Sequence, residues 1–190
     1  MRFIHGPVPE DPQFQPLEEG WNAIREPDPV RMQFVALPVM AAAGVLVWAA
    51  VRYGTVIQPQ AMMKWFLPAF VVMIPIHELI HAFASPAFGM SARTFVGVWP
   101  SKLLFYAHYE GELPRQRFLF VLAAPTLVLT VIPLLLAAAL RLDAPFLATI
   151  AFTNALGAAG DLLGIGIVLR QIPRGALVRN KGWRSYWRMP

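Results

Sequence analysis

The chain has 190 residues, of which 57% are hydrophobic and 14% are charged, and its formal net charge is +5. Soluble domains carry about a quarter charged residues, so this composition argues against an ordinary soluble domain and favours a membrane protein. The sequence contains no cysteine, which excludes disulfide bonds and thiolate metal ligands.

Residues 1–33 form the first distinct segment. They contain six prolines and six acidic residues but no apolar stretch. A secretory signal peptide needs an apolar stretch, so the segment does not have the pattern of one. Its low hydrophobicity and many prolines predict an extended, poorly ordered tail in the cytoplasm.

Four segments are almost free of charge over a membrane-spanning length. A hydrocarbon core of about 30 Å requires about 20 helical residues, so each segment is long enough to cross it, although the first is the shortest. Four such helices in so small a chain leave almost nothing to cover them in water. We therefore expect an all-α membrane protein whose core, residues 34–169, contains four transmembrane helices. The predicted helices span about residues 34–51, 65–88, 118–140 and 146–169.

The distribution of lysine and arginine predicts the orientation of this core. With four helices, the N-terminus, the loop after the second helix and the C-terminus share one side, and these regions hold thirteen of the sixteen basic residues. Basic residues accumulate on the cytoplasmic side, so we expect a multi-pass protein of the cell membrane, the bacterial inner membrane, with both termini in the cytoplasm. The basic, aromatic cytoplasmic tail at residues 170–190 suits anionic lipid headgroups. Nucleic acid is not an expected partner, because the basic residues are scattered around the membrane boundaries.

The loop at residues 89–116 is too long for a simple connection. Two runs rich in aromatic and β-branched residues, Thr94–Trp99 and Leu103–Tyr109, flank a turn at Pro100 and predict a small cytoplasmic β-hairpin. Such a hairpin either pairs with an unwound substrate segment or only caps the membrane surface. His108 lies in it and is interpreted mainly as a surface or interfacial histidine. The alternatives are a further metal ligand and a substrate-binding or transition-state-stabilising residue.

Only four ionisable side chains lie within the predicted helices: His77, Glu78, His81 and Asp161. Each is costly in hydrocarbon unless it is paired, bound to a metal or in contact with water. The first three form an H-E-x-x-H pattern, which on a helix brings both imidazoles to one face, where they can bind one cation. The glutamate lies beside them as a candidate general base. A pair of core histidines without a metal is the alternative.

Asp161 is the expected third metal ligand, because a catalytic zinc ion has three protein ligands and one open position. The second and fourth helices run in the same direction, and helix geometry puts His81 about 10 Å and Asp161 about 12 Å from their cytoplasmic ends. Asn154 precedes Asp161 by seven residues and so lies on the same helix face. We expect Asn154 either to hydrogen-bond the substrate or to join two helices.

The HELIH sequence at residues 77–81 and the NALGAAGD sequence at residues 154–161 resemble the site-2-protease class of intramembrane zinc metalloproteases. The resemblance is closer to small bacterial membrane proteins of the zincin peptidase type, and it extends more loosely through the four-helix core. It implies that the two histidines and Asp161 bind zinc and that Glu78 activates water. It also implies that the substrates are membrane proteins, cut within or near a transmembrane segment.

Hydrolysis of peptide bonds near the cytoplasmic side of the bilayer is therefore the leading hypothesis, with zinc as the cofactor. Serine and aspartyl mechanisms are disfavoured, because no serine lies deep within a predicted helix and Asp161 is the single aspartate there. Two alternatives stay open: a non-catalytic metal-binding membrane scaffold, and a proton or ion relay built from the same groups. A purely structural zinc prefers four protein ligands, which weighs against the scaffold.

Overall fold

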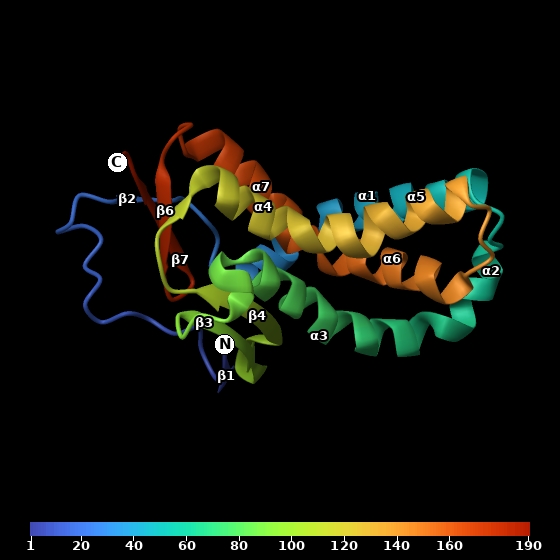
Figure 1. The fold of residues 1–190 in the computed structure, drawn as a ribbon, viewed down its shortest axis with the longest axis horizontal. Helices are drawn as coiled ribbons and strands as arrows, with labels where there is room; N and C mark the ends of the chain where they lie inside the picture. Colours follow the sequence, from blue (N-terminus) through green and yellow to red (C-terminus); the bar gives the residue numbers. More distant parts are fainter.

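The computed structural model describes residues 1–190, and its apolar helices form an elongated bundle with two small sheets gathered at one end (Figure 1). Both chain termini lie at the sheet end. The helices are α1 (Pro29–Gly54), α2 (Pro59–Met62), α3 (Phe66–Ala84), α4 (Arg115–Thr126), α5 (Ile132–Ala139), α6 (Pro145–Gly157) and α7 (Ala159–Gln171). The strands are β1 (Arg2–His5), β2 (Asn22–Ala23), β3 (Thr94–Trp99), β4 (Leu104–Tyr109), β5 (Leu113–Pro114), β6 (Leu177–Lys181) and β7 (Arg184–Arg188).

Three helical stretches are long and apolar enough to cross a membrane: Pro29–Gly54, Pro59–Ala84 and Arg115–Ala139. The pair α6 and α7 meets the same criterion only when its two helices, bent by 49° at their junction, are counted as one span. The structure therefore has three candidate membrane crossings, or four with this pair. This number fits a multi-pass membrane protein.

Helix α1 begins earlier than the predicted residue 34. The side chain of Asp28 accepts hydrogen bonds from the backbone N–H groups of Val30 and Arg31, and Pro29 lies in the first turn. An aspartate N-cap followed by proline is a strong helix start, so the helix extends beyond the apolar segment on which the prediction was based. The added turn brings Met32 to the cavity described below.

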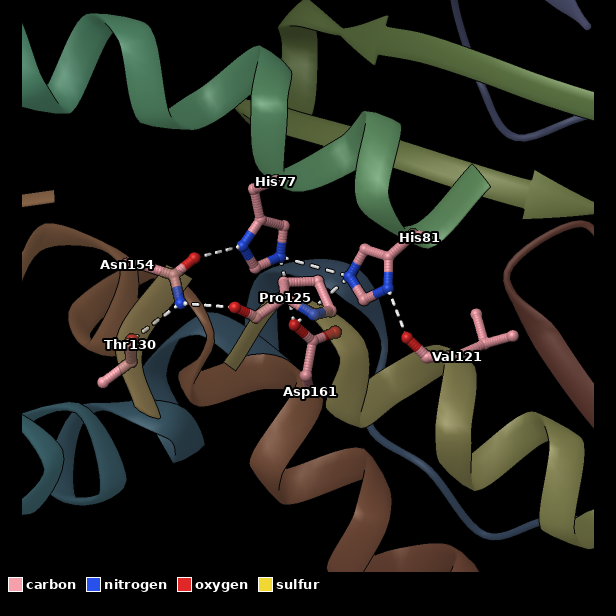
Figure 2. Close-up of polar contacts among 7 residues, drawn as sticks. All are labelled: His77, His81, Val121, Pro125, Thr130, Asn154 and Asp161. Carbon is pink, nitrogen blue, oxygen red and sulfur yellow. Dashed lines mark hydrogen bonds and ion pairs between the residues drawn. The ribbon is translucent and has the colours of Figure 1, made fainter. Parts of the chain in front are cut away.

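Helices α6 and α7 replace the single continuous helix predicted for residues 146–169. The helix breaks at Ala158, whose backbone leaves the α-helical region with φ −75° and ψ 4°. Gly157 and Gly160 flank the break, and glycine destabilises a helix relative to alanine. The bend puts Asp161 in the first turn of α7, where its side chain points toward α3 (Figure 2).

The first sheet has the strand order β1-β3-β4, with β1 parallel to β3 and β3 antiparallel to β4. Its β3 and β4 correspond to the two runs rich in aromatic and β-branched residues, and Thr94 lies opposite Tyr109. Strand β1 was not predicted and comes from the N-terminal segment. Strand β4 lies at the edge of the sheet and packs against α3, so it borders the site described below.

The second sheet has the order β2-β7-β6-β5, and its central hairpin, β6 and β7, comes from the C-terminal segment. Residues 170–190 were predicted to be a basic, aromatic tail. The many charged and aromatic residues of this segment were interpreted as a membrane anchor, and its two short strands were not predicted. Val178 and Ser185 are buried within these strands, and the Trp183 indole donates a hydrogen bond to Pro27 O at 2.9 Å. The fold is therefore mainly helical with two small sheets, which corrects the all-α prediction.

The N-terminal segment, predicted to be poorly ordered, packs on the C-terminal hairpin. The side chains of Phe14 and Trp21 are only 1% and 3% exposed, and their rings meet edge to face with 5.4 Å between centroids. Asp11 forms an ion pair with Arg179 at 2.6 Å, and the Arg179 guanidinium lies over the Phe14 ring. The prediction treated the two termini separately, whereas the acidic and aromatic residues of one complement the basic residues of the other.

Candidate functional site

Two histidines of α3 contact residues of three other helices, α4, α6 and α7. His77 and His81 are one helical turn apart and point from the same face of α3, as their spacing requires (Figure 2). Each is 7% exposed, and their Nε2 atoms lie 3.1 Å apart. The structure thus brings both rings to one point.

Asp161 of α7 completes a cluster of three potential metal ligands. Its Oδ2 atom lies 3.1 Å from His77 Nε2 and 3.3 Å from His81 Nε2. A tetrahedral zinc ion with bonds of 2.0–2.1 Å to nitrogen and oxygen separates its ligand atoms by about 3.3 Å. The three atoms therefore have the spacing of three ligands around one small cation, and this cluster is able to bind a metal.

The other ring nitrogen of each histidine is held by an acceptor. His77 Nδ1 lies 2.8 Å from Asn154 Oδ1, and His81 Nδ1 lies 2.8 Å from Val121 O. Because both partners only accept, each Nδ1 carries a proton, and Nε2 is the nitrogen that each ring directs at Asp161. The Asp161 Oδ2 atom is buried and accepts no hydrogen bond. Two Nε2 atoms and one carboxylate oxygen thus face a common point, where one bound cation would contact all three.

The orientation of Asn154 follows from its own neighbours. Its Nδ2 group donates to Pro125 O at 3.2 Å and to Thr130 Oγ1 at 2.9 Å, and the Thr130 hydroxyl donates to Ala151 O. The amide oxygen must therefore face His77. Asn154 is fully buried, and its amide atoms are occupied by the protein. Substrate binding by Asn154 stays a prediction that these contacts do not favour; its observed contacts orient His77.

A cavity of about 500 Å³ opens beside the cluster. Residues of α1, α3, α4, α7, β4 and the β6–β7 hairpin line it, among them His77, His81 and Asp161. Binding sites for small ligands and peptide side chains have volumes of about 300–1,000 Å³. The ligand cluster therefore lies at the wall of a space large enough for part of a peptide.

Glu78 lines the same cavity and is half-buried. It follows His77 in α3, and neither ion pair of the cluster uses its carboxylate. A carboxylate that borders the cavity without belonging to the ligand set is free to accept a proton from a molecule bound there. Glu78 therefore lies where a general base for a molecule in the cavity would lie, which is the role that the H-E-x-x-H pattern predicts.

His108 of β4 also lines the cavity and is 6% exposed. Its Nε2 atom is buried without a hydrogen-bond partner, and its ring lies beside that of Phe95. Burial lowers the pKa of His108 to about 4, so the ring is neutral at pH 7. The structure does not bring His108 into the ligand cluster, and it buries the ring more deeply than an interfacial position implies.

Of the groups that hold the two histidines, the sequence singled out only Asn154, and it did not predict the contact of Asn154 with His77. The Val121 carbonyl is a backbone atom, and Thr130 is one of several threonines in apolar helices. Pro125, which lies in the interior of α4, was the one available signal for these contacts.

The fold and the cluster together define a protein of membrane-spanning helices with a His-His-Asp centre able to bind a metal. Residues 70–177 match the model of a family described as "Putative zincin peptidase". The match covers more than half of the chain, so the chain belongs to this family, which suggests a zinc metallopeptidase. Comparisons with curated proteins and with solved structures give no match.

Proposed function

We propose that the protein is an intramembrane zinc metallopeptidase that hydrolyses peptide bonds of transmembrane or membrane-associated proteins. The observation that carries this proposal is the convergence of three ligand atoms from two separate helices, next to a carboxylate in a cavity of about 500 Å³. Membership of the zincin peptidase family supports the chemistry. The run of apolar helices around the site supports the membrane location of the substrate.

In this proposal His77 Nε2, His81 Nε2 and Asp161 Oδ2 hold the zinc ion. When bound, zinc supplies a Lewis acid that polarises the scissile carbonyl and acidifies water. Catalytic zinc sites have three protein ligands, whereas structural sites have four. A ligand set of three beside a cavity therefore favours the peptidase over the metal-binding scaffold.

Glu78 acts as the general base and then as the general acid. Its carboxylate takes a proton from the attacking water and later delivers that proton to the leaving amine. Asn154 and the Val121 carbonyl keep both imidazoles in the tautomer that offers Nε2 to the cluster. Asn154 is thus a positioning residue rather than a substrate contact in this account.

Strand β4 is the proposed binding surface for the substrate chain. It is an edge strand, and residues 104–109 all line the cavity. An extended peptide can pair with such an edge through backbone hydrogen bonds. His108 has an unpaired Nε2 atom on this strand and, being neutral, is suited to hydrogen-bond a substrate backbone group.

We further propose that the sheet end faces the cytoplasm of a bacterial cell. Both termini and both sheets lie at this end, and they carry most of the basic residues (Figure 1). Arg179 and Arg188 of the C-terminal hairpin are paired with Asp11 and Glu112. We therefore expect the other basic residues of the segment 170–190 to contact anionic lipid headgroups.

The direct test is the Glu78→Gln variant, with Glu18→Gln as a control, because Glu18 is exposed and far from the cavity. Each protein is expressed in cells that lack the endogenous enzyme, and new N-termini in the membrane fraction are mapped by mass spectrometry. We expect cleavage to fall about 10²- to 10⁴-fold in Glu78→Gln, with zinc retained, and to stay unchanged in Glu18→Gln. Equal cleavage in all proteins would remove Glu78 as the base. Zinc binding without any cleavage would favour the scaffold.

A further inference from the structure

Helix α4 contains an interior proline, Pro125, next to both histidine contacts. In an α-helix each N–H donates to the carbonyl four residues earlier, so the residue at 125 would donate to Val121 O. Proline has no N–H, and Val121 O therefore lacks its helical donor. This carbonyl is the one that accepts from His81 Nδ1, at 2.8 Å.

The carbonyl of Pro125 serves the second histidine. Pro125 O accepts from Asn154 Nδ2 at 3.2 Å, and the other end of this amide accepts from His77 Nδ1 (Figure 2). One turn of α4 thus supports both imidazoles, His81 directly and His77 through Asn154. The Pro125 side chain is fully buried, so its ring is also packed into the protein.

A π-helical segment, Leu127–Val131, follows this turn directly. It contains Thr130, which accepts the second hydrogen bond from Asn154 Nδ2. Irregular turns within helices are frequent at functional sites, because they leave backbone groups available for other contacts. The interruption that begins at Pro125 therefore coincides with the contacts that orient the ligands.

We infer that Pro125 is a positioning residue of the metal centre: by withholding an N–H group, it reserves the Val121 carbonyl for His81. This inference rests on the proposed function, since it concerns the same site. An ordinary residue at 125 restores an N–H group that competes with His81 Nδ1 for Val121 O. Loss of such supporting contacts typically weakens metal binding about 10- to 100-fold.

The test compares Pro125→Ala with Pro38→Ala, a second helix-interior proline that lies in α1 and makes no contact with the ligands. Zinc affinity is measured on the detergent-purified chain by competition with a chromophoric chelator, and the Co²⁺ absorption spectrum reports the ligand geometry. We expect Pro125→Ala to bind zinc 10- to 100-fold more weakly and to alter the Co²⁺ spectrum. Its metal-free thermal unfolding temperature should hold or rise, because alanine favours a helix. Pro38→Ala should leave zinc affinity unchanged.

A third protein separates the missing N–H from the lost ring. It carries the α-hydroxy analogue of alanine at position 125, which has the alanine side chain but an ester in place of the amide. We expect this ester to recover most of the wild-type zinc affinity. An ester that binds as weakly as Pro125→Ala would overturn the inference, as would unchanged affinity in Pro125→Ala or a parallel loss of affinity and metal-free stability. If the wild-type chain binds no zinc, the proposed function itself fails.

Discussion

Each histidine of the cluster uses one ring nitrogen for the ligand set and the other for the protein. This division means that a contact outside the cluster decides which nitrogen is available inside it. For His77 that contact is Asn154, whose amide is itself fixed by Pro125 O and Thr130. The orientation of the His77 ring therefore depends on residues that are not themselves in the ligand cluster.

Asn154→Ala should weaken zinc binding about 10- to 100-fold, because His77 Nδ1 loses its acceptor and the ring is free to change tautomer. Competition with a chromophoric chelator measures the effect. Asn22→Ala is the control, since Asn22 is exposed and does not line the cavity. Unchanged zinc affinity together with a raised KM would instead return Asn154 to the substrate-binding role that the sequence suggested.

His108 should make the stability of the metal-free protein depend on pH. Burial lowers its pKa to about 4, whereas in the unfolded chain it titrates near 6.5. Between these values only the unfolded state takes up the proton, so the free energy of unfolding falls as the pH drops from 6.5 to 4 and is unaffected above 6.5. The loss contributed by His108 is at most about 3 kcal/mol.

Thermal unfolding in detergent, with a chelator present, measures this slope in His108→Gln against the wild type. The variant should lose part of the slope between pH 4 and 6.5, while His5→Gln, at an exposed position of β1, should keep all of it. A wild-type slope in His108→Gln would show that the His108 ring is solvated in the folded protein.

The ligand residues were predictable from the sequence because charge in hydrocarbon is costly and therefore rare. That argument singled out Glu78 and the three residues His77, His81 and Asp161, which the structure brings together. The groups that accept hydrogen bonds from the two histidines were not predictable in this way. Val121 contributes a backbone carbonyl, which has no signature in residue type, and the burial of Asn154 depends on how three helices pack.

At the scale of elements, the site depends on breaks in regular structure. The 49° bend between α6 and α7 turns Asp161 toward α3, and the π-helical segment after α4 presents Thr130 to Asn154. Apolar composition predicts where a helix lies but not where its axis bends. The short strands β6 and β7 pair with each other, but the strands that flank them, β5 and β2, come from distant segments, so the local sequence does not reveal the complete sheet.

Gly97 tests the packing of the first sheet. A Cβ atom at this position in β3 would lie 2.5 Å from the Tyr106 ring and 2.7 Å from Ile4 O. The Tyr106 hydroxyl is held by Gly6 O and Pro7 O, so the ring has little room to move. Gly97→Ala should therefore destabilise the protein by about 1–3 kcal/mol.

The matched control is Gly166→Ala in α7, where an added Cβ meets no atom within 4 Å. This change should be neutral or stabilising by up to about 1 kcal/mol, because alanine favours a helix. Thermal unfolding of both variants in the same detergent decides the matter. Equal stability of the two would mean that β1 and Tyr106 do not pack on Gly97 as described.

At the scale of the whole molecule, the sheets and both termini lie at one end of the helix bundle (Figure 1). The cavity beside the ligand cluster is lined by strands of this end. The opposite end consists of short connections, such as the one between α5 and α6. In the proposed function, the sheet end is the end at which a substrate strand and water reach the cavity. The proposed cytoplasmic orientation is therefore open to a direct labelling test.

The chain has no cysteine, so single cysteines report sidedness without background. Leu103→Cys, in the exposed turn between β3 and β4, should react with a membrane-impermeant maleimide only after the cells are permeabilised. Asp143→Cys, in the exposed loop before α6, should react in intact cells. The reverse pattern, or labelling of both in intact cells, would contradict the orientation.

The central claim is that His77, His81 and Asp161 hold one zinc ion, and the metal content of the purified protein tests it most directly. Elemental analysis of the detergent-purified wild type should find about one zinc per chain, as a three-ligand site requires. Zinc should be lost in Asp161→Ala and retained in Glu78→Gln. A wild-type protein without zinc, or an Asp161→Ala protein that keeps it, would contradict the account.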